Sequence, residues 1–183
     1  ETHVGEPYKG LDPNQIASEI TREFNLNMEY CDIADGEVSL PPITLRQQDL
    51  KTEYSVQIAR NSYVYFNYAT HNSTPDQVMD KMIKGATKAF NNVVNDLNMQ
   101  YEKYTKENDY PFERLPWEAR VISYNQLLEN VKAERGDELE RRIQELSTEL
   151  LKDKNVDERI FALKMVEMVH NMWSDKDPVV IAY

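Results

Sequence analysis

The side chains that could bind a metal are few and lie in the last third of the chain. Glu167 and His170 are spaced as Glu-x-x-His, which puts both on one face of a helix, as in di-metal carboxylate bundles. Such sites use the motif on two helices together with two further glutamates, whereas this sequence contains it once. The spacing therefore predicts that Glu167 and His170 belong to helix packing and hold no metal.

Two carboxylates, those of Glu145 and Glu149, lie at the i, i+4 spacing of one helical face. Two carboxylates in this arrangement could hold Mg²⁺ in a hydrolase. However, three cations interleave with them: Arg141, Arg142 and Lys152. This pattern is typical of ion pairs on a solvated helix, so we expect no metal here and keep a carboxylate-metal hydrolase as an alternative function.

Motifs for nucleophilic catalysis or nucleotide binding are missing from the sequence. It contains no Gly-x-Ser-x-Gly, no P-loop, no Gly-rich nucleotide turn and no Cys-x-x-Cys. Cys31 is the one cysteine, so no disulfide can form within the chain. We therefore assign no catalytic residue and no cofactor, and the sequence favours a protein that is not an enzyme.

The net charge of −11 disfavours two classes of partner. It repels a phosphate backbone and an anionic membrane surface, so we expect neither direct nucleic-acid binding nor membrane binding. Residues 1–60 are the most acidic for their length, which would suit a basic partner. No stretch approaches the ~20 apolar residues of a membrane span. A cytoplasmic location follows most simply, with export left open because residue 1 is Glu rather than Met.

An aromatic-rich stretch over 54–68 alternates with period two and predicts β-structure. The polar residues 60–62 suggest a hairpin turn, and a three-residue loop keeps the apolar side chains on one face. Those apolar residues are Tyr54, Val56, Val64 and Phe66. Tyr63 and Tyr65 then lie on the opposite face, where a partner or a second layer would cover them. A single long strand is the alternative interpretation.

Helix start signals divide most of the remaining chain. They predict five helices, beginning at Pro13, Pro75, Trp117, Asp137 and near Asn155–Glu158. The closing residues 177–183 could form a strand that adds an edge to the hairpin sheet. The expected fold is α+β, with a small antiparallel sheet near 53–69 packed on a dominant helical half. We expect residues 1–183 to form a single domain with a flexible leader at 1–10 and a helical C-terminal subregion at 111–174.

The helix from Pro75 continues to about Tyr104, and this length suggests an interface. At roughly 45 Å it exceeds the ~26 Å diameter of a 100-residue domain, so its C-terminal third should project. Leu97, Tyr101 and Tyr104 lie there and could contact a partner or a second copy. We therefore expect a non-catalytic, acidic protein–protein interaction module: an adaptor, inhibitor or assembly protein. A second alternative is an acidic nucleic-acid mimic that blocks a DNA-binding protein.

Overall fold

The computed structural model describes residues 2–183, and the chain divides into two compact units, Glu1–Val121 and Ile122–Tyr183. The described residues contain five α-helices and three sheets of two strands each. The predicted α+β class, dominated by helices, is confirmed. That the whole chain is a single domain stays a prediction.

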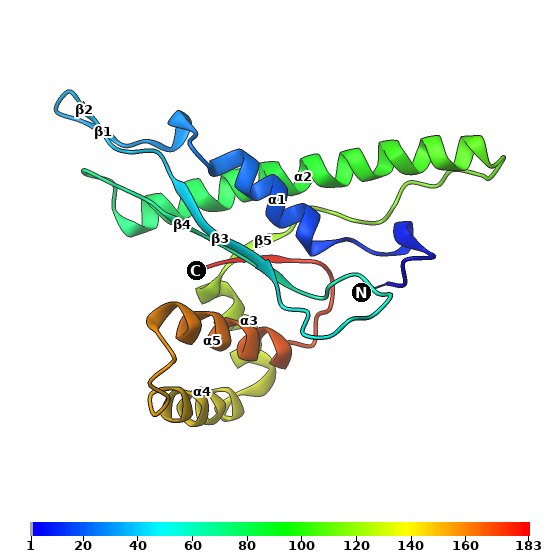
Figure 1. The fold of residues 1–183 in the computed structure, drawn as a ribbon. Coiled ribbons are helices and arrows are strands. Elements are labelled where there is room, and N and C mark those ends of the chain that lie inside the picture. The colour runs from blue at the N-terminus through cyan, green and yellow to red at the C-terminus, as the bar shows by residue number, and fades with distance from the viewer. Residues whose placement is uncertain (1) are drawn as a thin grey trace. The chain divides into compact units, whose positions relative to one another are not determined.

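The first unit is built around two helices, α1 (Pro13–Phe24) and α2 (Pro75–Glu107). Both begin as predicted. Asp12 accepts the backbone N–H of Asn14 at 2.9 Å, and Thr74 forms a capping box with Gln77. The apolar side chains of α1 recur every four residues and are buried: Ile16, Ile20 and Phe24. Helix α1 contacts α2 on one side and a two-stranded sheet on the other (Figure 1).

The sheet beside α1 corrects the predicted hairpin. Strand β4 (Ser62–Asn67) pairs antiparallel with β3 (Ile43–Asp49), not with residues 54–59. Tyr54 lies on a loop and is 94% exposed, and Val56 is exposed too, so their predicted burial was wrong. Val64 and Phe66 are half-buried, and the Phe66 ring lies 5.4 Å from that of Phe24.

Strand β3 was not predicted from the sequence because few of its residues are apolar. Gln47 holds the strand to α1 with polar contacts, donating to Ser18 Oγ at 2.9 Å and accepting from the Thr21 hydroxyl at 2.7 Å. A bulge between Thr44 and Arg46 shifts the register and breaks the alternation of side chains. Without an apolar period of two, the usual strand signal is lost.

A small hairpin, β1 (Ile33–Ala34) with β2 (Glu37–Val38), is fixed to the rest of the first unit by Asp32. One carboxylate oxygen of Asp32 accepts the backbone N–H groups of His71, Asn72 and Ser73 at 2.7–2.9 Å. These hydrogen bonds hold the pKa of Asp32 well below its ordinary value. The hairpin is thereby tied to the loop that leads into α2.

The predicted flexible leader makes defined contacts in the structure. Val4 N–H donates to Val56 O at 2.9 Å, and Ile58 N–H donates to Thr2 O at 3.0 Å. The short 3₁₀ helix η1 (Pro7–Lys9) places Tyr8 against α2. A second 3₁₀ helix, η2 (Met28–Tyr30), follows α1.

Gly85 lets α2 approach the end of α1 closely. An added Cβ would lie 2.5 Å from Phe24 Cζ and would also clash with the Tyr30 hydroxyl. That hydroxyl donates to Glu23 Oε1 at 2.7 Å, and Lys88 Nζ donates to the same oxygen at 2.9 Å. Burial, followed by the contact with Glu23, raises the pKa of Tyr30. The buried carboxylate is thus compensated where the two helices meet.

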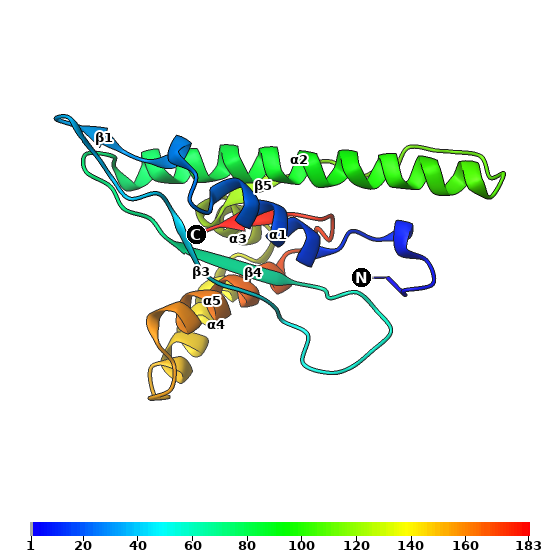
Figure 2. The ribbon, with the colours of Figure 1, turned by 45° about the horizontal axis from the view of Figure 1, so that its top comes forward.

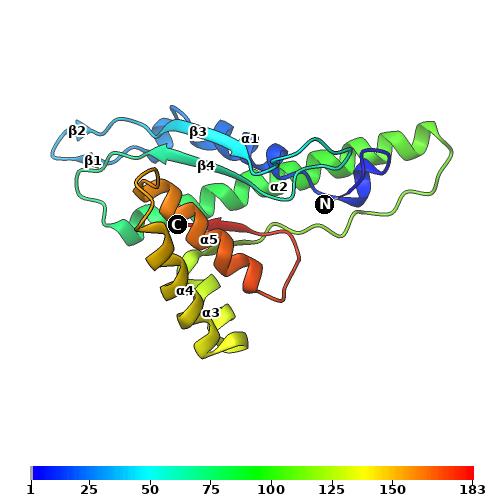
Figure 3. The ribbon, with the colours of Figure 1, turned by 60° about the horizontal axis from the view of Figure 1, so that its bottom comes forward.

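The second unit packs three helices, α3 (Tyr124–Arg135), α4 (Asp137–Leu150) and α5 (Glu158–Met172) (Figure 3). Its buried core comes from all three helices and the residue after α5: Leu127, Val131, Leu139, Val169 and Trp173. Two short strands, β5 (Val121–Ser123) and β6 (Val180–Ala182), form a separate sheet.

Two predictions in this region are corrected. The third helix begins at Tyr124 rather than Trp117, because Ser123 forms a capping box with Gln126 and the preceding residues are extended. The C-terminal strand exists, but it pairs with β5 and not with the sheet that contains β4. Helix α4 begins at Asp137 as predicted, and α5 begins at Glu158 after the cap Asp157.

Gly85→Ala should destabilise the protein although alanine is the better helix former. The helix preference favours alanine by about 1 kcal/mol, whereas overpacking a tight core costs about 1–3 kcal/mol. We expect a net loss in the free energy of unfolding, measured by urea denaturation. The exposed neighbour Lys84, changed to alanine, is the control and should be close to neutral. Equal or greater stability of Gly85→Ala would show that α1 and α2 are not tightly packed here.

Asp32→Asn should change how stability depends on pH. The folded pKa of Asp32 is lowered, so its stabilising contribution is present above the unfolded pKa of about 3.9 and is lost as pH falls through the folded pKa. The difference in unfolding free energy between wild type and Asp32→Asn should therefore stay constant from about pH 7 to pH 5 and shrink below about pH 4. Denaturation curves at each pH test this. A difference in unfolding free energy that does not change with pH would contradict it.

Candidate interaction surfaces

An aromatic cluster forms at the C-terminal end of α2. The Tyr8 ring lies 4.7 Å from that of Tyr101 and 5.4 Å from that of Tyr104, and Phe112 lies 5.9 Å from Tyr101. We call these four residues the aromatic end of α2. The structure thus brings the two predicted tyrosines together with two aromatics that the sequence analysis missed. Tyr8 was not predicted because it lies in the expected flexible leader. Phe112 was not predicted because it lies in the proline-rich segment after the helix.

The segment after α2 is held against the helix by buried polar groups. Asn98 is buried; its Nδ2 donates to Val94 O and its Oδ1 accepts the backbone N–H of Leu115, both at 2.8 Å. Closer to the turn, Tyr110 N–H donates to Thr105 O at 2.9 Å. These bonds turn the chain back along α2 and bring the Phe112 ring near Tyr101.

The aromatic end remains partly open to solvent. The Tyr104 side chain is 47% exposed, and Phe112 and the neighbouring Tyr110 are exposed as well. Leu97, one turn earlier in α2, is half-buried. An exposed aromatic group on a rigid helix is an uncommon use of surface, because monomers usually scatter their apolar residues singly.

The other predicted pair, Tyr63 and Tyr65, lies on β4, away from the aromatic end of α2. Their rings stack with centroids 6.2 Å apart and planes 6° from parallel. Arg46 of β3 lies 5.9 Å from the Tyr63 ring centroid. Because side chains alternate along a strand, both tyrosines face away from the side on which Val64 and Phe66 meet α1. Their part in any interface stays a prediction.

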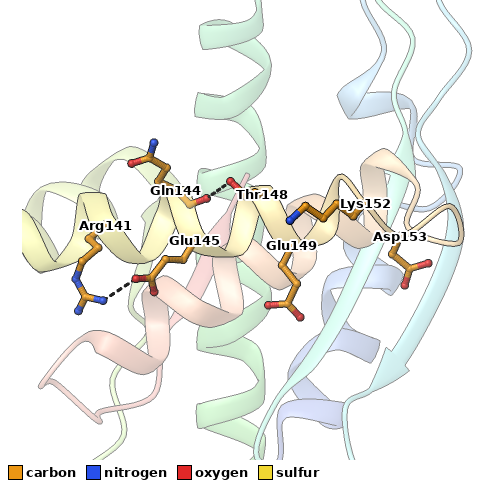
Figure 4. Close-up of a pocket in the computed structure, with 7 residues that line it drawn as sticks. All are labelled: Arg141, Gln144, Glu145, Thr148, Glu149, Lys152 and Asp153. Atoms are coloured by element: carbon orange, nitrogen blue, oxygen red, sulfur yellow. Dashed lines mark hydrogen bonds and ion pairs between the residues drawn. The ribbon is translucent and has the colours of Figure 1, made fainter.

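A shallow hollow follows one face of α4 in the second unit (Figure 4). Its seven lining residues come from α4 and the turn after it: Arg141, Gln144, Glu145, Thr148, Glu149, Lys152 and Asp153. Glu145 accepts from Arg141 at 2.7 Å and from Arg142 at 3.0 Å, and these hydrogen bonds lower its pKa. The hollow is the solvated, ion-paired helix face that the sequence predicted.

Within residues 2–183, neither Glu167 with His170 nor Glu145 with Glu149 is joined by a third side chain that could bind a metal. Glu167 and His170 are half-buried on α5. Among residues 2–183, no three His, Cys, Asp or Glu side chains converge as a metal site would require. In the same part of the chain, no helix has both the length and the apolar character needed to cross a membrane.

Mg²⁺, Mn²⁺ and Fe²⁺ should leave the melting temperature unchanged. A ligand that binds only the folded state must raise it, and Glu145 is already engaged by two arginines. Differential scanning fluorimetry with and without each ion tests this. A clear rise that disappears in Glu145→Ala or Glu167→Ala would instead reveal a metal site.

Comparison with curated proteins finds two relatives in Bacillus subtilis (strain 168). The chain is 31% identical over 183 residues to the protein RocB and 29% identical over 184 residues to YqjN, described as an uncharacterized protein. All of this chain aligns in both cases, yet it spans only about a third of each relative's length. No family model matches the chain, and no solved structure matches it.

Proposed function

We propose that this chain is a non-catalytic protein–protein interaction module, acting in the cytoplasm as an adaptor, inhibitor or assembly protein. The observation that carries the proposal is the aromatic end of α2. There four aromatic rings pack on one another and still leave Tyr104 and Phe112 exposed. Exposed apolar groups gathered in one place commonly mark interaction sites.

The chemistry of this surface suits a protein partner. Tyrosine presents an apolar ring and a polar tip, and it is enriched among the residues that dominate binding energy. Tyr8 and Phe112 restrict the rings of Tyr101 and Tyr104 before any partner arrives, so little side-chain freedom remains to be lost on binding. The surface is thus preorganised.

The charges around the aromatic end admit either a second copy or another protein. Exposed residues of both signs surround it on α2: Glu102, Lys103, Lys106 and Glu107. A mixed rim can face its own copy without a strong repulsion. The acidic chain as a whole disfavours direct nucleic-acid binding. The test of this proposal therefore has to measure both self-association and binding to a separate protein.

Replacing Tyr104 and Phe112 by lysine tests the proposal. Placing charges in an interface core should weaken association by about 2 kcal/mol or more, roughly 30-fold. Light scattering over a range of concentrations measures self-association. Capture with the immobilised chain in a lysate of the source organism measures binding to other proteins. Circular dichroism and thermal melts establish that the variant is folded.

Tyr54→Lys is the matched control, because Tyr54 is 94% exposed and lies on the loop before β4. It makes the same chemical change without touching α2. Assembly and capture that survive in the control and fail in the double variant support the proposal. A folded double variant with unchanged mass and an unchanged set of captured proteins would refute it.

A further inference from the structure

The β1–β2 hairpin carries large apolar side chains on its outer side. Ile33 and Val38 are directly opposite in the register, so their side chains share one face. Ile33 is 71% exposed, and Leu40, two residues beyond Val38, is 74% exposed. Leu26 and Met28, which precede the hairpin in the chain, are exposed as well. We call the five residues the hairpin surface: Leu26, Met28, Ile33, Val38 and Leu40.

The opposite side of the hairpin is fixed to the first unit. Asp32 and Ser39, each next to an outward residue, are buried. Ser39 N–H donates to Asp32 O, and Asp32 N–H donates to Ser39 Oγ, both at 2.8 Å. The Asp32 carboxylate also holds the loop before α2. The hairpin reaches past the N-terminal end of α2 in both views (Figures 1 and 2). The hydrogen bonds of Asp32 and Ser39 fix which of its sides faces outward.

Leu26 occupies a conformation that opposes its residue type. It follows the C-cap of α1 with φ at 58°, in the left-handed region where glycine is favoured and a branched side chain is strained. Its N–H donates to Pro42 O at 2.9 Å, beside the segment that carries Leu40. The side chain is exposed, so burial of its apolar atoms does little to offset the strain. Contact with another molecule would bury this side chain and so offset the backbone strain.

The charges around this surface select the partner. Residues 23–45 contain five acids and no lysine or arginine. Three of the acids are exposed and form what we call the acidic rim: Glu29, Asp35 and Glu37. A second copy would bring the same negative rim and be repelled, whereas lysine or arginine side chains would be attracted.

We propose that the hairpin surface docks a basic amphipathic segment of a partner polypeptide. The apolar side chains of that segment cover Ile33, Val38 and Leu40, and its lysines or arginines face the acidic rim. Apolar contact supplies most of the affinity, while the charges supply the selection and its dependence on salt. This surface is separate from the aromatic end of α2 and does not depend on the function proposed for it.

A labelled helical peptide of leucine and lysine, about 18 residues long, is the probe. We expect saturable one-to-one binding to the whole chain by fluorescence anisotropy, weakened as salt is raised. Two control peptides complete the probe set. One replaces lysine with glutamate and should not bind, and the other scrambles the sequence so that no apolar face forms and should bind at least about tenfold more weakly.

Variants of the chain locate the binding. Ile33→Ser with Leu40→Ser should weaken it at least about tenfold, whereas Leu151→Ser, an exposed leucine of the second unit, should not change it. Neutralising the acidic rim with Glu29→Gln, Asp35→Asn and Glu37→Gln should weaken binding and flatten its salt dependence. Its control removes the same charge elsewhere, with Glu138→Gln, Glu149→Gln and Glu158→Gln.

Leu26→Gly separates binding from folding. Glycine removes the strain, so the melting temperature should stay constant or rise while peptide binding falls. The proposal is overturned if the glutamate peptide binds equally well, or if the two charge-neutralised variants behave alike. It is also overturned if Ile33→Ser with Leu40→Ser abolishes self-association instead, because the occupant is then a second copy. All these variants keep the aromatic end of α2, so the two proposals can fail separately.

Discussion

The close contact between α1 and α2 at Gly85 is the constraint on which the first unit depends. The missing side chain of Gly85 leaves room for Phe24, which is fully buried, and for the Tyr30 hydroxyl. That hydroxyl compensates Glu23, and Tyr68 donates its own hydroxyl to Tyr30 O at 2.7 Å. The Phe66 ring lies against Phe24 from the sheet side. Both helices, η2 and the end of β4 are therefore tied together at one point.

This arrangement explains how a two-stranded sheet persists. An isolated two-stranded hairpin is marginal in water, and strands normally need a packed face. Here α1 covers one face with apolar contacts to β4 and polar contacts from Ser18 and Thr21 to Gln47. The other face keeps Tyr63, Tyr65 and Arg46 in contact with one another. The sheet therefore depends on the helix that covers it.

The sequence predicted those elements whose signals are local. Asp12 and Thr74 cap helices with side chains a few residues from the groups they bind, so the starts of α1 and α2 could be read directly. Ser123 with Gln126 carries the same kind of signal. The helix was nevertheless predicted to begin at Trp117, because two prolines nearby also suggest a helix start. Strand β3 gave no such signal, because Gln47 makes polar contacts with residues more than 25 positions away.

The candidate surfaces show the same division. Tyr101 and Tyr104 could be predicted because they share one helix face. Tyr8 and Phe112 reach them only because the segment before α1 and the segment after α2 both fold back against α2. The outward side of the β1–β2 hairpin could not be assigned either, since Asp32 fixes it through a loop about forty residues later.

Helix α2 sets the distance between the two proposed surfaces. Asp32 ties the hairpin to the residues just before its N-terminal cap, and the aromatic end lies in its last turns. The helix has 33 residues, which span about 50 Å at 1.5 Å per residue. A partner at one end therefore leaves the other accessible, and their binding energies should add unless α2 itself changes. On the two proposals, the helix would separate a contact point selected by charge from one selected by aromatic packing.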